Sequence, residues 1–272
     1  MPKVTILTPL YNGEQYIEQA ILGILGQSYR DFEYYIINDG STDHGADIIR
    51  RITDKRVNII EQDNKGAAAA INNGLRRALG EYVGFCDQDD IWLSDKLERQ
   101  VAFLDAHPDA DVVYSDARMA DAEGKFLSET WMQSRRTSPC TGSSMCMLPL
   151  FERNFICAPL VVLMRKKLFE DIGFFNETFS SAYDYEFWFR MLEADKTVEF
   201  IEEPLAVWRT HEFQESKNIR KAKIMLISIL REFLRRNPEF KKRHPTAVFK
   251  KWIKAYGALV LAMIPSLYEN RN

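Results

Sequence analysis

Residues 81–90 read EYVGFCDQDD, an apolar run that ends abruptly in the three carboxylates Asp87, Asp89 and Asp90. A buried strand of an α/β sheet delivers its last residues to the carboxyl edge of the sheet, where ligands bind. Three carboxylates in one place repel one another unless a cation lies among them. The stretch therefore predicts a divalent metal that also binds a phosphate ester. A solvated acidic turn that leads into the next helix, with Asp90 as part of it, is the simpler alternative.

Short apolar segments alternate with helical patterns on both sides of this stretch. We expect strands at 4–8, 32–38, 57–61, 82–86, 111–115, 159–164, 197–201 and 206–210. We expect helices at 16–27, 44–51, 67–78, 97–106 and 185–193, with a weak pattern and a loop between 119 and 149. Nearly continuous apolar strands are typical of strands buried on both faces, and the alternation favours a mostly parallel sheet with flanking helices.

The composition, 46% hydrophobic and 28% charged over 272 residues, is typical of a globular protein with a substantial core. The cysteines, which show no paired CxxC spacing, are expected to be reduced thiols rather than disulfides or a zinc site; they are Cys86, Cys140, Cys146 and Cys157. The N-terminus lacks a signal-peptide pattern, and the apolar stretch 255–267 is shorter than the ~20 residues that span a bilayer. We therefore expect a cytoplasmic protein.

The charge of the chain is unevenly distributed. Residues 215–272 contain 14 Lys and Arg against 4 Glu, a net charge of +10, whereas the residues before them carry −13. The helical patterns at 219–234 and 247–261 are basic and amphipathic, and three interpretations stay open. These helices pack on the body or form a homodimer, they lie on the inner face of the cell membrane, or they bind nucleic acid, which the acidic body disfavours.

Polar turns follow the first three predicted strands as well. They are TPLYNG at 8–13, NDGSTD at 38–43 and QDNKG at 62–66. Together they indicate a crevice of nucleotide size, although neither a GxGxxG fingerprint nor a GxxxxGK[ST] loop is present. Tyr11 is placed to stack on a base and Asp39 to reach a ligand, while residues 41–43 are equally suited to cap a helix.

As an ordered set, these turns resemble glycosyltransferase family 2 over about residues 3–215. The matching segments are residues 9–12, 38–43, 64–66, 87–90 and 184–190. The resemblance implies a GT-A fold, with a catalytic domain at 1–214 and a basic helical region at 215–272. Residues 1–90 would form its nucleotide-binding half and 91–214 its acceptor half. The implied activity is inverting transfer of a sugar from a nucleotide diphosphate, most commonly a UDP-sugar, to a glycan or lipid-linked acceptor of a bacterial surface polysaccharide.

The resemblance also implies roles for individual residues. Asp184 would be the catalytic base, and Asp89 with His211 would hold Mn²⁺ or Mg²⁺. The nucleotide would be bound by Pro9, Tyr11, Asp39, Asn64 and Asp87. Taken singly, Asp184 is equally well explained as a helix N-cap and His211 as a packed histidine.

Candidates on the acceptor side are weaker. Trp92 and Trp131 could stack on a sugar ring, although Trp92 fits the core equally well. Glu186 could substitute as the base. The family usually has Arg at the position of Ile71 and an acidic residue at that of Tyr183.

Two other functions stay open. The departures at positions 71 and 183 leave room for a catalytically silent module that binds nucleotide sugars or glycans. A sugar nucleotidyltransferase would need a glycine-rich phosphate loop after the first strand, which residues 8–13 do not supply.

Overall fold

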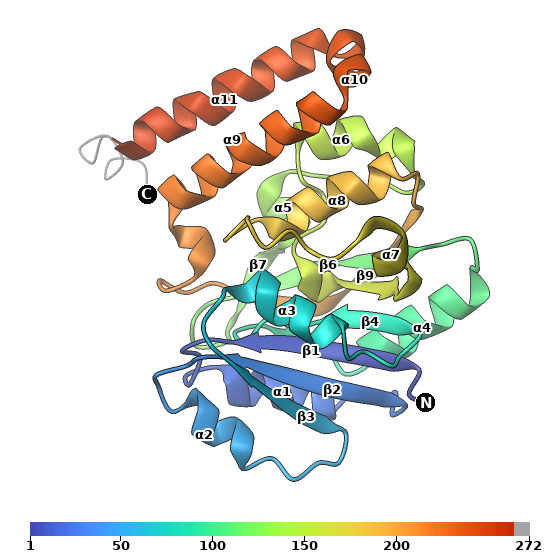
Figure 1. Cartoon of the computed structure of the whole chain (residues 1–272), viewed down its shortest axis with the longest axis vertical. Coiled ribbons are helices and arrows are strands. Elements are labelled where there is room, and N and C mark those ends of the chain that lie inside the picture. The colour runs from blue at the N-terminus through green and yellow to red at the C-terminus, as the bar shows by residue number, and fades with distance from the viewer. Residues whose placement is uncertain (264–272) are drawn as a thin grey trace.

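A mixed sheet of nine strands forms the centre of the computed structural model, which describes residues 1–263 (Figure 1). The strands are β1 (Val4–Leu10), β2 (Phe32–Asp39), β3 (Val57–Gln62), β4 (Tyr82–Phe85), β5 (Ile91–Trp92), β6 (Val112–Ala120), β7 (Phe126–Thr130), β8 (Val162–Arg165) and β9 (Val198–Arg209). Their order is β3-β2-β1-β4-β8-β6-β9-β5, and β7 pairs with β6. The predicted α/β class is confirmed.

Helices flank the sheet, and among the described residues three more α-helices follow its last strand in the chain. They are α1 (Ile17–Leu25), α2 (Gly45–Arg50), α3 (Ala67–Leu75), α4 (Lys96–Ala106), α5 (Trp131–Arg135), α6 (Met147–Glu152), α7 (Lys167–Ile172), α8 (Tyr183–Glu193), α9 (Ile219–Arg236), α10 (Pro238–Arg243) and α11 (Pro245–Met263). Figure 1 shows the blue N-terminal strands at one end of the molecule and α9–α11 at the other.

Parallel pairing holds for β3, β2, β1 and β4, as the alternation of strands and helices predicts. Beyond β4 the sheet is mixed, because β8 runs antiparallel to both β4 and β6. The expectation that the strands are buried on both faces is wrong for β3. This strand lies at the sheet edge and is largely exposed or half-buried.

Several predicted segments differ from the structure. In the strand expected at 159–164, residues 159–161 form a 3-10 helix that precedes β8. β1 continues past Thr8 and includes Pro9, which is tolerated because β4 pairs only as far as Leu7 and leaves one side of β1 free of a neighbour. The two strands expected at 197–201 and 206–210 are one strand, β9, with a register shift where it pairs with β6. The weakly patterned segment 119–149 contains β7 and α5 and the start of α6.

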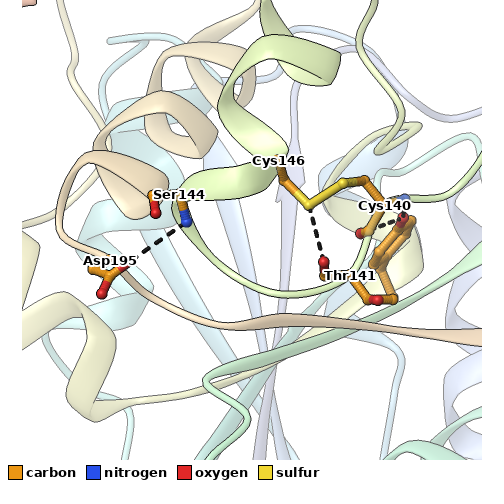
Figure 2. The surroundings of a disulfide bond; sticks show 6 residues. Cys140, Thr141, Ser144, Cys146 and Asp195 are labelled. Carbon is orange, nitrogen blue, oxygen red and sulfur yellow. Dashed lines mark hydrogen bonds between the residues drawn. A yellow bond between two sulfur atoms is a disulfide. The ribbon is translucent and has the colours of Figure 1, made fainter.

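The expectation of four reduced thiols is wrong for two of them. Cys140 and Cys146, which are six positions apart in the chain, form a disulfide that closes a short loop (Figure 2). The loop is also held by Tyr114, whose hydroxyl accepts from the Cys140 N–H at 2.9 Å. Two cysteines only six residues apart can be joined by a turn, so CxxC is not the only spacing that permits a bridge. Cys86 and Cys157 are free.

The C-terminal helices pack on the body rather than extending from it. Phe233 of α9 stacks on Phe189 of α8, with ring centroids 4.3 Å apart. Arg236 of α9 also donates to the carboxylate of Glu193 at 3.0 Å. In α11, Val248 and Ala255 are buried. Among residues 1–263, no helix combines the length and apolar character needed to cross a bilayer. Residues 264–267 of the apolar stretch noted above lie outside the described residues.

Candidate functional site

The acidic turn after β4 is tied to the end of β9. Asp90 is 2% exposed, and its carboxylate accepts the backbone N–H of Arg209 at 3.0 Å. The Arg209 guanidinium in turn donates to the backbone carbonyl of Asp89 at 2.9 Å. Asp90 is therefore a structural residue that fixes the turn. Its interpretation as part of a solvated acidic turn is wrong, because its carboxylate faces inward.

Asp89 and His211, the two predicted metal ligands, face each other. Their Oδ2 and Nε2 atoms are 2.8 Å apart, although 122 positions separate them in the chain. The ring of His211 also packs on Tyr16, at 4.7 Å between centroids. The other ring nitrogen, Nδ1, is buried and has no hydrogen-bond partner. The geometry therefore brings one carboxylate and one imidazole to the same point at the sheet edge.

The surroundings of Asp87 disfavour negative charge. Burial, together with the charges of Asp89 and Asp184, raises its pKa to about 7. Burial and the neighbouring acids also raise the pKa of Asp90. A cation among these groups would relieve the repulsion and restore the ionised forms.

The donor set fits a divalent ion in part. Carboxylate oxygen and imidazole nitrogen both suit Mn²⁺. Within the described residues, no cluster of three or more His, Cys, Asp or Glu side chains is arranged to hold a metal. An ion bound by Asp89 and His211 would therefore take its remaining ligands from phosphate oxygens and water.

Gln88 fixes the turn after β1, a role that sequence reasoning missed. Its side-chain oxygen accepts the Tyr11 N–H at 2.8 Å, and its amide donates to the Tyr11 carbonyl at 3.1 Å. A Cβ on Gly13 would lie 2.5 Å from the Gln88 side chain, so the pair requires glycine there. The Tyr11 ring is 47% exposed and accessible to a ligand. Pro9, by contrast, is buried within β1.

Asp39 organises the turn between β3 and α3. It is 2% exposed, and its carboxylate accepts the N–H groups of Lys65 and Gly66, each at 2.8 Å. Gly66 has φ +91°, which glycine adopts without strain. These bonds leave Asn64 exposed at the turn. The structure thus gives Asp39 a positioning role, and its hydrogen bond to a base stays a prediction.

Asp184 occupies the second position of α8, so its interpretation as the N-cap is wrong. Ala182 is the N-cap, in the left-handed conformation with φ 56°. Burial raises the pKa of Asp184 to about 6, although the backbone N–H groups of Tyr185 and Asp184 act in the opposite direction. A carboxylate of that basicity at a helix N-terminus is suited to general-base chemistry.

Asn72 connects the nucleotide half to the segment that leads to Asp184. It is 1% exposed and donates to the carbonyl of Phe175 at 2.9 Å and to the carboxylate of Glu177 at 2.8 Å. The Phe175 N–H donates back to the Asn72 side chain at 3.1 Å. Ile71, where the family usually has Arg, is fully buried and contributes to the core.

The structure argues against the three acceptor candidates, because all are covered by protein. Trp92 is 2% exposed, and its indole N–H donates to the carbonyl of Phe85 at 3.2 Å. Trp131 begins α5 and is also buried. The Glu186 side chain is buried and pairs with Arg190 at 3.0 Å. None of the three presents a surface to a sugar.

The sheet and the polar turns at its edge are those of an α/β protein with a ligand site at the strand ends. The chain belongs to glycosyl transferase family 2, because the model of that family matches residues 5–173, more than half of its length.

Curated relatives carry glycosyltransferase names. An uncharacterized glycosyltransferase of Rickettsia felis is 32% identical over 222 residues, which are 80% of this chain and 36% of that protein. The putative teichuronic acid biosynthesis glycosyltransferase TuaG of Bacillus subtilis is 42% identical over 106 residues, or 38% of this chain and 42% of that protein. The chain thus spans about a third of the length of the Rickettsia felis relative.

Solved structures confirm the GT-A fold. The mannosyltransferase PcManGT of Pyrobaculum calidifontis, in complex with GDP-Man and Mn²⁺, has a TM-score of 0.71 at 21% identity and covers 96% of this chain and 73% of its own. TarS 1–349 of S. aureus, in complex with UDP-GlcNAc, has a TM-score of 0.63 at 22% identity. The match covers 97% of this chain and 82% of the TarS chain.

Proposed function

We propose that the chain is an inverting, metal-dependent glycosyltransferase. It would move a sugar from a nucleotide diphosphate to a hydroxyl group of a glycan or lipid-linked acceptor. The observation that carries the proposal is the contact of Asp89 with His211 beside Asp87. The negative charge of Asp184 contributes to the raised pKa of Asp87, so Asp184 lies near the same cluster of acids.

The donor would bind along the turns that follow β1, β2 and β3. Tyr11 offers an exposed ring for the base, and Asp39 holds the turn on which Asn64 is exposed. Asp87 would contact the ribose or the metal shell. A UDP-sugar is the favoured donor, and the complex of TarS with UDP-GlcNAc supports it. The complex of PcManGT with GDP-Man keeps guanine as the alternative base.

Asp89 and His211 would hold the divalent ion, Mn²⁺ or Mg²⁺. When bound, the ion supplies positive charge to the diphosphate as the bond to the sugar breaks. Asp90 and Arg209 keep Asp89 in place through the bonds described above.

Asp184 would take the proton of the acceptor hydroxyl as that oxygen attacks the sugar. With a pKa of about 6, the carboxyl group is mostly ionised at neutral pH and more basic than an ordinary aspartate. Direct attack by the acceptor on the face opposite the leaving diphosphate inverts the anomeric carbon. A single base is sufficient for this reaction.

We place the reaction in bacterial surface polysaccharide synthesis, on the cytoplasmic side of the membrane. The name of TuaG supports this setting. The acceptor would be selected by β7, α5 and the residues up to α6, and no side chain in this segment is assigned to it.

The test is a panel of nucleotide sugars, each with Mn²⁺ or with EDTA, read by thermal shift and by slow hydrolysis to nucleoside diphosphate. We expect one donor to stabilise the protein in a metal-dependent way. Asp89→Ala should abolish that shift, and Asp184→Asn should keep it but lose hydrolysis. Asp109→Asn, which changes an exposed carboxylate away from the site, is the matched control.

A catalytically silent binding module is the second candidate, favoured by the replacement of the usual Arg by the buried Ile71. It predicts stabilisation by a donor without hydrolysis and without transfer to any glycan acceptor. The absence of a metal-dependent shift with every nucleotide sugar would contradict both candidates.

A further inference from the structure

A row of apolar side chains faces solvent along α11. The exposed fractions are Phe249 66%, Ile253 58%, Tyr256 40%, Val260 55% and Met263 58%. Their spacing of four and three residues places them on one side of the helix. Figure 1 shows α11 as the outermost element, with α9 between it and the body. Among the described residues the row is therefore largely open to solvent, with Tyr256 at its margin beside Arg231 of α9.

The opposite side of α11 already has its packing partner. Val248 and Ala255 are buried there, and at the margin between the two sides the Arg231 guanidinium of α9 donates to the Tyr256 hydroxyl at 2.6 Å. The Lys251 ammonium donates to the carbonyl of Glu152 in α6 at 3.2 Å. The helix is thus held in place by one face while the other remains open. A contiguous exposed apolar row of this size indicates an interaction surface.

The charges beside the row are all positive. Lys250 and Lys254 are exposed next to it, and residues 240–263 contain no Asp or Glu. A cavity of about 280 Å³ at the turn between α10 and α11 adds Arg243 and His244, with Glu152 as its one carboxylate. Lys250 lines this cavity as well. The surface therefore combines an apolar centre with a basic margin.

We propose that this face of α11 docks on an anionic lipid bilayer. Phe249, Ile253 and Val260 would enter the boundary between head groups and acyl chains, and the lysines would meet lipid phosphates. A second copy of the chain fits less well, because pairing two α11 helices brings lysines together and the helix offers no carboxylate to balance them. A nucleic acid would meet the lysines but leave the apolar row uncovered.

Docking would also orient the candidate site. The chain passes from His211 through Gln214, whose amide bonds the carbonyl of Arg209, into α9. Because α11 packs on α9, a bilayer bound by α11 would have a fixed orientation relative to the sheet edge. This inference goes beyond the proposed function and does not require sugar transfer.

The test is co-sedimentation of the full chain with vesicles of phosphatidylcholine alone or of phosphatidylcholine with phosphatidylglycerol. We expect binding to the anionic vesicles only. Phe249→Ser/Ile253→Ser should lower the bound fraction about tenfold or more, since it removes the apolar anchors. Lys250→Gln/Lys254→Gln should lower it as well and weaken its salt dependence. Leu22→Ser/Leu79→Ser, which removes exposed leucines of the body, should leave it unchanged.

Three results would overturn the proposal. One is no sedimentation with anionic vesicles, and another is equal binding by the wild type and the Phe249→Ser/Ile253→Ser variant. The third is a dimer, measured by light scattering, that this variant converts to monomer. Hydrolysis of a soluble nucleotide sugar by the same variants reports on the proposed function separately, because none of these residues lies in the candidate site.

Discussion

The nucleotide edge of the sheet and the segment between β6 and α6 are held in different ways. At the nucleotide edge, side chains of one turn bind the backbone of the next, as Gln88 does with Tyr11 and Asp39 with residues 65 and 66. Between β6 and α6, the chain is held by backbone pairing, such as that of Gly142 with Val198, and by single side-chain contacts, such as that of Asp116 with the Met132 N–H at 3.0 Å, while a disulfide closes a loop within the segment. The first region is therefore cross-linked from turn to turn by side chains, whereas the second is held mainly by backbone pairing and a local disulfide.

The largest effect on the comparison is expected from replacing Asp184, the proposed base. Asp184→Asn should lower the transfer rate by about 10²–10⁴-fold, the usual contribution of general-base catalysis. Donor-induced stabilisation should persist, because the nucleotide turns are untouched. Steady-state kinetics and thermal shift on the same preparation check both parts. An unchanged rate would move the base to another residue.

The pH profile should show the same group titrating. Burial raises the pKa of Asp184 to about 6, and the base acts only when ionised. Below that pH the rate should fall about tenfold per unit, and above it the rate should level off. Asp184→Glu should shift the inflection if the profile reports this group. A flat profile down to pH 5 would contradict the assignment.

A smaller effect is expected where the nucleotide edge is cross-linked. Gln88→Ala removes two hydrogen bonds that hold the Tyr11 turn, each worth about 1 kcal/mol. We expect KM for the donor to rise several-fold with little change in kcat. Gln133→Ala removes one side-chain hydrogen bond, to the Thr130 N–H in the capping box of α5, and should leave donor KM unchanged. An equal rise in donor KM in the two variants would contradict the proposed difference between the two regions.

The smallest effect on activity is expected from the disulfide. Cys140→Ala/Cys146→Ala should lower the free energy of unfolding by about 2 kcal/mol, as the chain-entropy estimate gives for a loop of this length. Donor hydrolysis should stay near the wild-type rate. Mass spectrometry of the unreduced protein with thiol alkylation checks the bond itself. Alkylation of all four cysteines would show that they are reduced thiols and would contradict the disulfide.

The sequence was informative where function depends on short, local patterns. The carboxylates after β4 and the glycine-broken turns after β1 and β2 could be read directly, because strand ends converge at one edge of a parallel sheet. The pairing of Asp89 with His211 followed only from the family resemblance. The roles of Gln88 and Arg209 could not be read from the sequence, since their partners are distant in the chain.

The tryptophans show a second limit. Trp92 follows the acidic turn, but its indole ring packs into the core against Gly84, which has no side chain to block it. The sequence pattern does not reveal on which side of a two-residue strand a side chain falls. Trp131 is buried at the start of α5, in a segment whose sequence has no clear periodicity.

The central claim is that Asp89 and His211 together hold the divalent ion that carries the donor diphosphate. The most direct measurement is calorimetric titration of Mn²⁺ into the protein with UDP, comparing the wild type with His211→Ala and with the Asp109→Asn control. We predict that the affinity for Mn²⁺ falls at least about 10-fold in His211→Ala, the scale expected for loss of a group that binds or orients at a metal site. Equal affinity in the wild type and His211→Ala would contradict the claim.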